Sequence, residues 1–138
     1  MANLADHTDA SPLEATGIHV GYGGEDVLHD VSLAVPQGRV TTIIGPNGCG
    51  KSTLLKSFSR LLRPRTGEVT LLGEPLHSQR PKEIARRLAV LPQRPVAPEG
   101  MTVSELVRRG RQPHQPWYRQ WSEQDEEFTA AAMRDTHV

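Results

Sequence analysis

The sequence predicts an α/β domain built around one buried strand, a glycine-rich turn and an amphipathic helix. Residues 40–44 form a β-branched run without alternating polarity, which is typical of a strand buried on both faces. Glycines dominate residues 45–50, and the apolar positions of residues 51–62 then recur at helical spacing. A central strand that runs through a tight turn into a helix is the basis of the α/β prediction.

Two strands are expected ahead of this central strand. Residues 1–14 are polar and predict a flexible tail, with packing that begins near Ala15. Residues 18–22 and 27–35 alternate as strands do, and the glycines between them favour a hairpin.

Shorter elements are expected after the helix. Pro64 and Gly67 end the helix, and residues 68–72 then read as a strand. Residues 81–88 predict a short helix whose proline suits the first turn, and residues 89–91 predict a brief strand.

Two further helices carry start signals. Prolines within residues 92–98 predict a stiff connector. Thr102 and Glu105 have the spacing of a capping box, and Ser122 precedes a helix over residues 123–133 with acidic residues in its first turn.

Composition excludes several classes of protein. Sixteen basic and sixteen acidic residues give 138 residues a formal charge of zero, which disfavours a protein built to coat nucleic acid. The longest wholly apolar runs hold about four residues, against the roughly 18 to 20 that cross a bilayer. A single cysteine leaves no internal disulfide, and the amino terminus lacks a secretory signal, so we expect a cytoplasmic protein.

The middle of the chain is basic. Residues 60–111 hold eleven basic and five acidic side chains, a surplus that could face acidic lipid or a partner. The alternative is a solvated face, which the absence of interleaved aromatic residues favours.

Residues 45–52 match the phosphate-loop pattern Gly-x4-Gly-Lys-[Ser/Thr], in the strand–turn–helix context that the pattern requires. The composition predicts only about 0.003 chance matches in a chain of this length. Glycines let successive N–H groups turn inward around phosphate oxygens at a helix amino terminus. The expected nucleotide-binding residues of the loop are Gly45, Asn47, Gly48, Cys49, Gly50, Lys51, Ser52 and Thr53.

Three of these residues have separate expected roles. Lys51 can reach the β and γ phosphates, and the Ser52 hydroxyl can bind Mg²⁺. Cys49 is expected to be a small filler beside the nucleotide, with a redox switch as the alternative.

With Gly-Pro-Asn-Gly-Cys-Gly-Lys-Ser-Thr at residues 45–53, the chain resembles ABC transporter ATP-binding subunits over about residues 15–138. Tyr22, 23 residues before the loop, resembles the family's A-loop aromatic, which stacks on adenine. Leu91-Pro92-Gln93 is similar to the Q-loop, which implies that Gln93 touches Mg²⁺ and the attacking water, and that the residues after it meet a permease subunit. The alternatives are a hairpin-edge tyrosine and a solvated glutamine in a proline-rich loop.

A weaker similarity points to one subfamily. Residues 103–114 and the Cys49 form of the loop resemble importers of ferric siderophores, haem and cobalamin. Trp117, Trp121 and Asp125 add to this similarity, with helical packing as their alternative role. The six histidines are scattered without short ligand spacing, so we expect no transition-metal site and place any iron in the cargo.

Parts of the family pattern are missing from the sequence. It holds no Leu-Ser-Gly-Gly-Gln-type signature, no apolar strand that ends in Asp-Glu, and no switch histidine. The resemblance therefore implies the amino-terminal part of a longer subunit: an incomplete nucleotide-binding core over residues 15–93, with a RecA-like P-loop NTPase fold and an antiparallel β subdomain. Residues 94–138 are then the connector and the start of the helical subdomain.

The resemblance implies an ATPase that uses ATP and Mg²⁺ to power import. It also implies a dimer of ATP-binding subunits that is cytoplasmic and peripheral on the inner face of the cell membrane. We expect the 138 residues alone to be inactive. The alternatives are a non-transport ABC ATPase and a nucleotide-binding fragment without turnover. GTPases are disfavoured because neither Asn-Lys-x-Asp nor Asp-x-x-Gly occurs.

Overall fold

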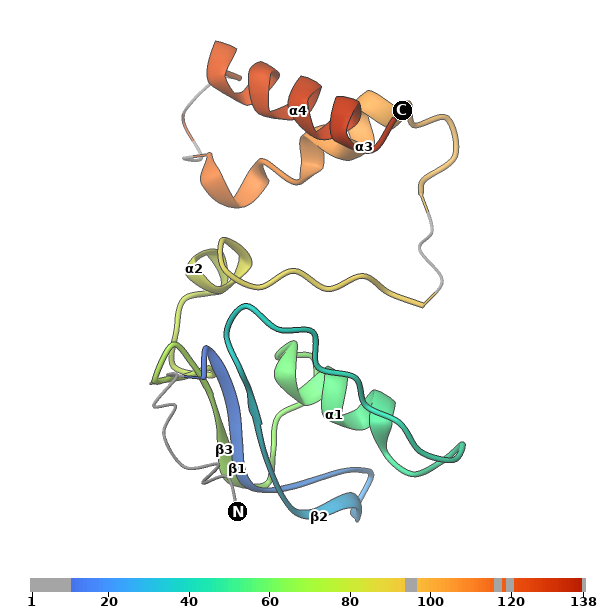
Figure 1. Ribbon diagram of the computed structural model, residues 1–138, viewed down its shortest axis with the longest axis vertical. Coiled ribbons are helices and arrows are strands. Elements are labelled where there is room, and N and C mark those ends of the chain that lie inside the picture. Colours follow the sequence, from blue (N-terminus) through green and yellow to red (C-terminus); the bar gives the residue numbers. More distant parts are fainter. Residues whose placement is uncertain (1–10, 94–96, 116–117, 119–120, 138) are drawn as a thin grey trace, which may run out of the picture. The chain divides into compact units, whose positions relative to one another are not determined.

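A computed structural model describes residues 11–93, 97–115, 118 and 121–137, which fall into the units Met1–Arg80 and Pro81–Val138. The first unit holds β1 (Leu13–Tyr22), β2 (Glu25–Val35), α1 (Lys51–Phe58), β3 (Thr66–Leu71) and β4 (Glu74–Pro75) (Figure 1). The second unit holds α2 (Pro81–Ala85), α3 (Val103–Arg109), the 3₁₀ helix η1 (Gln112–His114) and α4 (Glu123–Asp135).

The predicted hairpin of β1 and β2 is confirmed, and it forms one edge of an antiparallel sheet. The strand order is β2-β1-β3-β4, and the tip of the hairpin pairs Tyr22 with Glu25 across a two-glycine turn. Gly21 is required here, because a Cβ at this position would lie 1.7 Å from the carbonyl oxygen of Glu25. The strand β1 begins at Leu13, two residues ahead of the expected start of packing.

The core of the first unit lies between the sheet and α1, which runs along one face of the sheet (Figure 1). Helical spacing explains the contribution of α1, since Leu54 and Phe58 are four residues apart and both are buried. The sheet contributes its own buried aliphatic side chains, which include Ala15, Ile18, Val20, Leu28, Val69 and Leu71.

The predicted helix over residues 51–62 is shorter in the structure, and its apolar stripe is narrower. The helix α1 ends at Phe58, because Arg60 adopts a left-handed conformation with φ of 63°. The N–H of Leu62 then bonds to the carbonyl of Lys56 at 3.0 Å, which closes the helix end. Leu55 and Leu61, expected on the buried stripe, are 56% and 71% exposed.

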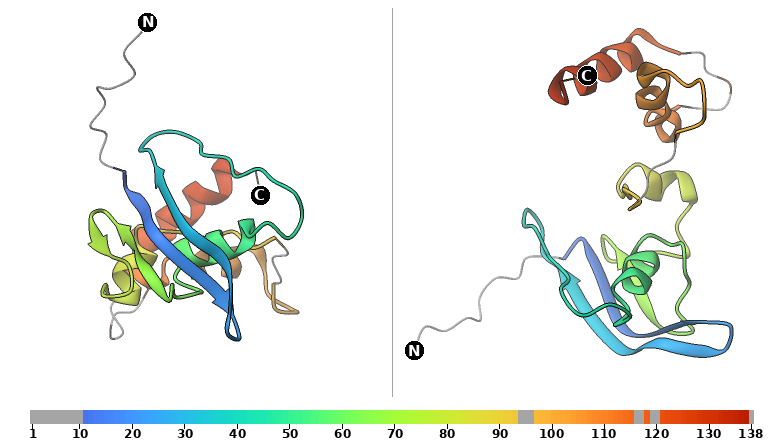
Figure 2. Two further views of the ribbon diagram at one scale, coloured as in Figure 1. Left: turned by 90° about the horizontal axis from the view of Figure 1, so that it is seen from below. Right: turned by 90° about the vertical axis from the view of Figure 1, so that its right-hand side faces the viewer.

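The prediction of a central strand at residues 40–44 is wrong for this structure. The segment has no strand hydrogen bonding, and Val40 and Ile44 are 95% and 86% exposed. Residues 36–50 instead form an arc from β2 to α1, teal in Figure 2. The brief strand at residues 89–91 is also absent. A strand needs a neighbour for its backbone groups, and the sheet of the described residues pairs only β1 to β4.

The predicted capping box of Thr102 and Glu105 is confirmed in the second unit, and Ser122 forms a second one with Asp125. The Thr102 hydroxyl accepts from the N–H of Glu105 at the start of α3, and the Ser122 hydroxyl accepts from the N–H of Asp125 at the start of α4. The short helix α2 ends at Ala85, three residues before the predicted end. Within the described residues, no helix combines the length and the apolarity needed to cross a membrane.

Candidate nucleotide-binding site

The phosphate-loop residues form a turn that leads directly into α1. Gly48 and Gly50 adopt left-handed conformations, with φ of 84° and 94°. A Cβ at Gly50 would also lie 2.6 Å from Cδ2 of Leu28 on β2, so conformation and close packing both require glycine. The end of the loop at Gly50 therefore packs against the hairpin strand β2.

The amino terminus of α1 offers donors to an anion. Its N-cap is Gly50, which has no side chain to cap the first turn, and no acidic residue lies in that turn. The first N–H groups of a helix have no partner within the helix, and the helix dipole favours a negative charge beside them. Asn47, Gly48 and Ser52 are exposed around this end. These features fit the backbone cradle that a phosphate group needs.

The Lys51 side chain folds over the loop. Its Nζ donates to the carbonyl oxygens of Gly45 and Pro46 at 2.9 and 2.6 Å, and lies 3.6 Å from Sγ of Cys49. The Cys49 thiol is exposed. Its Sγ lies so near Gly45 that a Cβ added to that glycine would be only 2.8 Å from the sulfur. Lys51 therefore supplies the positive charge of the loop.

Ser52 and Thr53 differ in accessibility. The Ser52 side chain is exposed in the first turn of α1, where a hydroxyl can bind a metal ion beside the loop. Thr53 is only 5% exposed, and its carbonyl accepts a hydrogen bond from the Ser57 hydroxyl at 2.9 Å. Thr53 is thus less open to a ligand than the sequence suggested.

Tyr22 lies against α1 as well. Nζ of Lys56 donates to the Tyr22 hydroxyl at 3.2 Å and lies 5.3 Å from the ring centroid. Hydrogen bonds from Lys56 and then Thr53 lower the pKa of Tyr22. The side chain remains half exposed, so part of its ring is open to a stacking partner. The helix α1 therefore follows the phosphate loop directly and also contacts the expected aromatic residue, Tyr22.

The remaining expected site residues lie in the second unit. Gln93 is exposed at a bend, and Trp117 lies outside the described residues. Trp121 and Asp125 belong to the packing of α3 and α4: the Trp121 indole donates to Glu126 at 2.7 Å, and Asp125 is almost fully buried.

The profile described as "ABC transporter" matches residues 28–138, most of the chain. The chain belongs to the ABC transporter family. An achromobactin transport ATP-binding protein of Dickeya dadantii strain 3937 is 52% identical over 117 residues, which cover 85% of this chain and 44% of the relative. A petrobactin import ATP-binding protein of Bacillus anthracis is 48% identical over 124 residues, which cover 90% of this chain and 45% of the relative. The chain spans a little under half the length of these relatives.

Solved structures show the family fold. An ATP-binding subunit of an ABC transporter superposes with a TM-score of 0.71 at 33% identity, covering 84% of this chain and 46% of the solved one. The prediction of an α/β P-loop NTPase fold is thereby confirmed, although the described strands are those of an antiparallel sheet. Membership of this ATP-binding family implies a nucleotide site, and the phosphate loop is its candidate.

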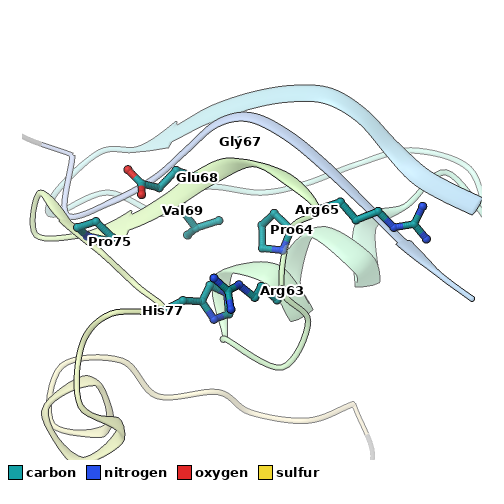
Figure 3. A pocket seen from close by; sticks show the side chains of 8 residues that line it. All are labelled: Arg63, Pro64, Arg65, Gly67, Glu68, Val69, Pro75 and His77. Atoms are coloured by element: carbon teal, nitrogen blue, oxygen red, sulfur yellow. The ribbon is translucent and has the colours of Figure 1, made fainter. Parts of the chain in front are cut away.

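A separate basic hollow lies between the end of α1 and β3 and has a volume of 320 Å³. Figure 3 shows Arg63 and His77 side by side at this hollow, with Arg65 on its far side. Burial and the charge of Arg63 lower the pKa of His77. None of the phosphate-loop residues lines this hollow, so it is separate from the candidate nucleotide site.

The sequence analysis did not predict two groups of side-chain contacts that the structure shows. Arginines of the basic middle of the chain pair with acids of this chain, as Arg108 and Arg111 do with α4 and Arg65 does with Asp26. Two histidines of the hairpin also converge on Asp26, ten residues apart in sequence. The antiparallel register of the predicted hairpin could have indicated that these two histidines lie near Asp26.

Proposed function

We propose that the chain binds ATP with Mg²⁺ through residues 45–53 and Tyr22. The observation that carries the proposal is the position of the Lys51 ammonium over a glycine loop that opens onto an uncapped helix start. A lysine that reaches across such a loop is the arrangement that binds the β and γ phosphates in P-loop proteins.

Each side chain has a distinct role in this proposal. Lys51 exchanges its two carbonyl partners for phosphate oxygens, while the N–H groups of the loop hold the same anion. The Ser52 hydroxyl and the Gln93 amide oxygen would hold Mg²⁺, which neutralises phosphate charge when bound. Tyr22 offers its exposed face to adenine, and Gln93 orients the attacking water.

In the complete subunit we propose that ATP hydrolysis powers import of a ferric siderophore or a related chelate. Support comes from relatives named for achromobactin transport and petrobactin import, each matched over 85% or more of this chain. The proposed partners are a permease, contacted by the region after Gln93, and a second ATP-binding subunit. In this proposal the protein acts on the cytoplasmic side of the membrane.

A non-transport ABC ATPase is the main alternative for the complete subunit. The names of the relatives favour transport, because they include import of petrobactin, of hydroxamate-bound iron and of hemin. Identification of the proteins that copurify with the subunit separates the two: a permease supports import, whereas ribosomes or DNA-repair factors would support the alternative.

Calorimetry tests the nucleotide site in this chain. Lys51→Ala is expected to weaken ATP binding more than adenosine binding, because it removes a phosphate contact. Tyr22→Ala is expected to weaken both ligands, with adenosine losing the larger share of its affinity. Lys82→Ala, a lysine of the second unit, is the matched control. Unchanged affinities in both site variants would overturn the assignment.

A further inference from the structure

Three potential metal ligands meet on the hairpin of β1 and β2. His19 lies on β1, while Asp26 and His29 lie on β2. One ligand atom of each residue, an imidazole nitrogen or a carboxylate oxygen, lies within 4.8 Å of the other two. The hairpin register explains the convergence, because Gly21 pairs with Asp26 and Val20 with Leu28.

The spacing suits a small cation. Nδ1 of His19 lies 3.5 Å from Oδ2 of Asp26. Two ligands bound tetrahedrally at about 2.0 to 2.2 Å from zinc are about 3.4 Å apart. The two imidazole rings are 6.0 Å apart and nearly perpendicular, at 89°. His19 and Asp26 are therefore already at ligand spacing, and the third ligand atom, on the exposed His29, lies within 4.8 Å of both.

The surroundings of the Asp26 carboxylate leave one of its two oxygens available as a metal ligand. Nη1 of Arg65 lies 3.2 Å from Oδ1 of Asp26 and donates to the carbonyl of Gly24 at 2.6 Å. Oδ1 itself is buried and accepts no hydrogen bond. The arginine thus contacts Oδ1, and the other oxygen, Oδ2, lies toward His19.

We propose that His19, Asp26 and His29 form a binding site for a late first-row divalent cation, such as Zn²⁺. Two imidazoles and one carboxylate are a ligand set that zinc accepts in proteins, with the fourth position open to water. The two nitrogen ligands disfavour Ca²⁺ and Mg²⁺, which prefer oxygen. The cation would tie β1 to β2 beside Tyr22, and the site does not depend on nucleotide binding.

Binding of Co²⁺ and Zn²⁺ to the full chain tests the proposal. One equivalent of Co²⁺ is expected to give the visible absorption of a low-coordinate nitrogen and oxygen site, and Zn²⁺ is expected to displace it. His19→Gln and His29→Gln are each expected to weaken binding at least about tenfold, since loss of even an outer-shell partner typically costs 10 to 100-fold. Asp26→Asn is expected to weaken it as well.

Two control variants locate the metal. His77→Gln alters a histidine outside the cluster, and Cys49→Ser removes the only thiol. Both are expected to bind Co²⁺ as the unchanged chain does, with no thiolate charge-transfer band. Far-UV circular dichroism checks that each variant is folded, and the exposed His29 is the position least able to disturb folding.

Three results would overturn the site. They are the absence of saturable Co²⁺ binding, affinity that survives in both His19→Gln and His29→Gln, and loss of binding in Cys49→Ser. Since none of these measurements involves ATP, failure here is distinct from failure of the nucleotide site.

Discussion

Lys56 donates a hydrogen bond to the hydroxyl of Tyr22, and its ammonium also lies 5.3 Å from the centre of that ring. The lysine sits five residues after Lys51 on the same helix, which corresponds to about 7.5 Å along the axis. One helix therefore carries the phosphate-loop lysine and fixes the hairpin aromatic. This link connects the hairpin tip to the loop through side chains far apart in sequence.

The first prediction concerns the ionisation of Tyr22. Lys56→Met removes the ammonium that favours the phenolate, so the pKa of Tyr22 should rise toward its ordinary value. The change should be measured in alkaline solution, because the ordinary pKa of a tyrosine is about 10. Ultraviolet titration of phenolate measures it, and Tyr22→Phe assigns the signal, because the chain has two tyrosines. A titration that Lys56→Met leaves unmoved would contradict the contact.

The second prediction separates the buried core from the exposed arc. Ile18→Ala is expected to lower the free energy of unfolding by about 2 to 5 kcal/mol, because Ile18 is fully buried. Ile44→Ala is expected to change it by less than about 0.5 kcal/mol, because Ile44 is 86% exposed. Urea unfolding measures both, and a large cost at Ile44 would instead support the central strand that the sequence predicts.

These two isoleucines show what the sequence could and could not predict. The alternation around Ile18 reflects a hairpin that pairs with its immediate neighbour in the chain, so local pattern was enough. The run that ends at Ile44 predicts a strand whose partners must come from elsewhere, and the described sheet holds none for it. Burial on both faces is a property of the neighbours as much as of the run itself.

The candidate site likewise has features that the sequence predicted and features that it did not. The contiguous pattern at residues 45–53 predicted a glycine-rich turn ahead of the helix, with Lys51 at the helix start. It did not predict Lys56 on Tyr22 or His29 beside Asp26, because those contacts depend on packing and register. The expected role of Cys49 as a filler beside the nucleotide stays a prediction, and its thiol is exposed in the loop.

The third prediction concerns acid sensitivity of α4. The Arg111 guanidinium and then the Ser122 hydroxyl hold the pKa of Asp125 well below its ordinary value. A lowered folded pKa means that the stabilisation is complete above the unfolded value of about 3.9, and is lost as pH falls toward the folded one. Helicity should therefore decline on acidification.

Asp125→Asn isolates this contribution. The variant should be less helical near pH 7 and should lose less helicity than the unchanged chain as pH falls. Glu123→Gln, an exposed change in the same helical turn, is the matched control. Circular dichroism across the acid range measures the effect, and equal acid responses in Asp125→Asn and the unchanged chain would contradict it.

The fourth prediction concerns the cap of α4. Ser122→Ala removes the hydroxyl that accepts from the Asp125 N–H, so it should destabilise the helix by about 1 kcal/mol. Ser122→Thr keeps an acceptor and should recover most of the loss. Thermal unfolding followed by circular dichroism compares the three chains, and a Ser122→Ala chain as stable as the unchanged one would sink the assignment.

The last prediction is that the 138 residues release phosphate from ATP no faster than background. In the proposed function, Lys51 binds phosphate and Ser52 is a metal ligand. The amide of Gln93 orients the attacking water. The sequence contains no apolar strand that ends in Asp-Glu, so it lacks the carboxylate that polarises water. A well-placed general base typically contributes about 10² to 10⁴ in rate.

Phosphate release should be measured beside Lys51→Ala and beside a full-length family member as the positive control. Activity that Lys51→Ala does not change would be a contaminant, because it would not depend on the phosphate loop. Turnover that disappears in Lys51→Ala would contradict the prediction and would require a base among the acids of this chain. Glu68 and Glu99 are then the first to replace, since both are exposed and neither is engaged in a described ion pair.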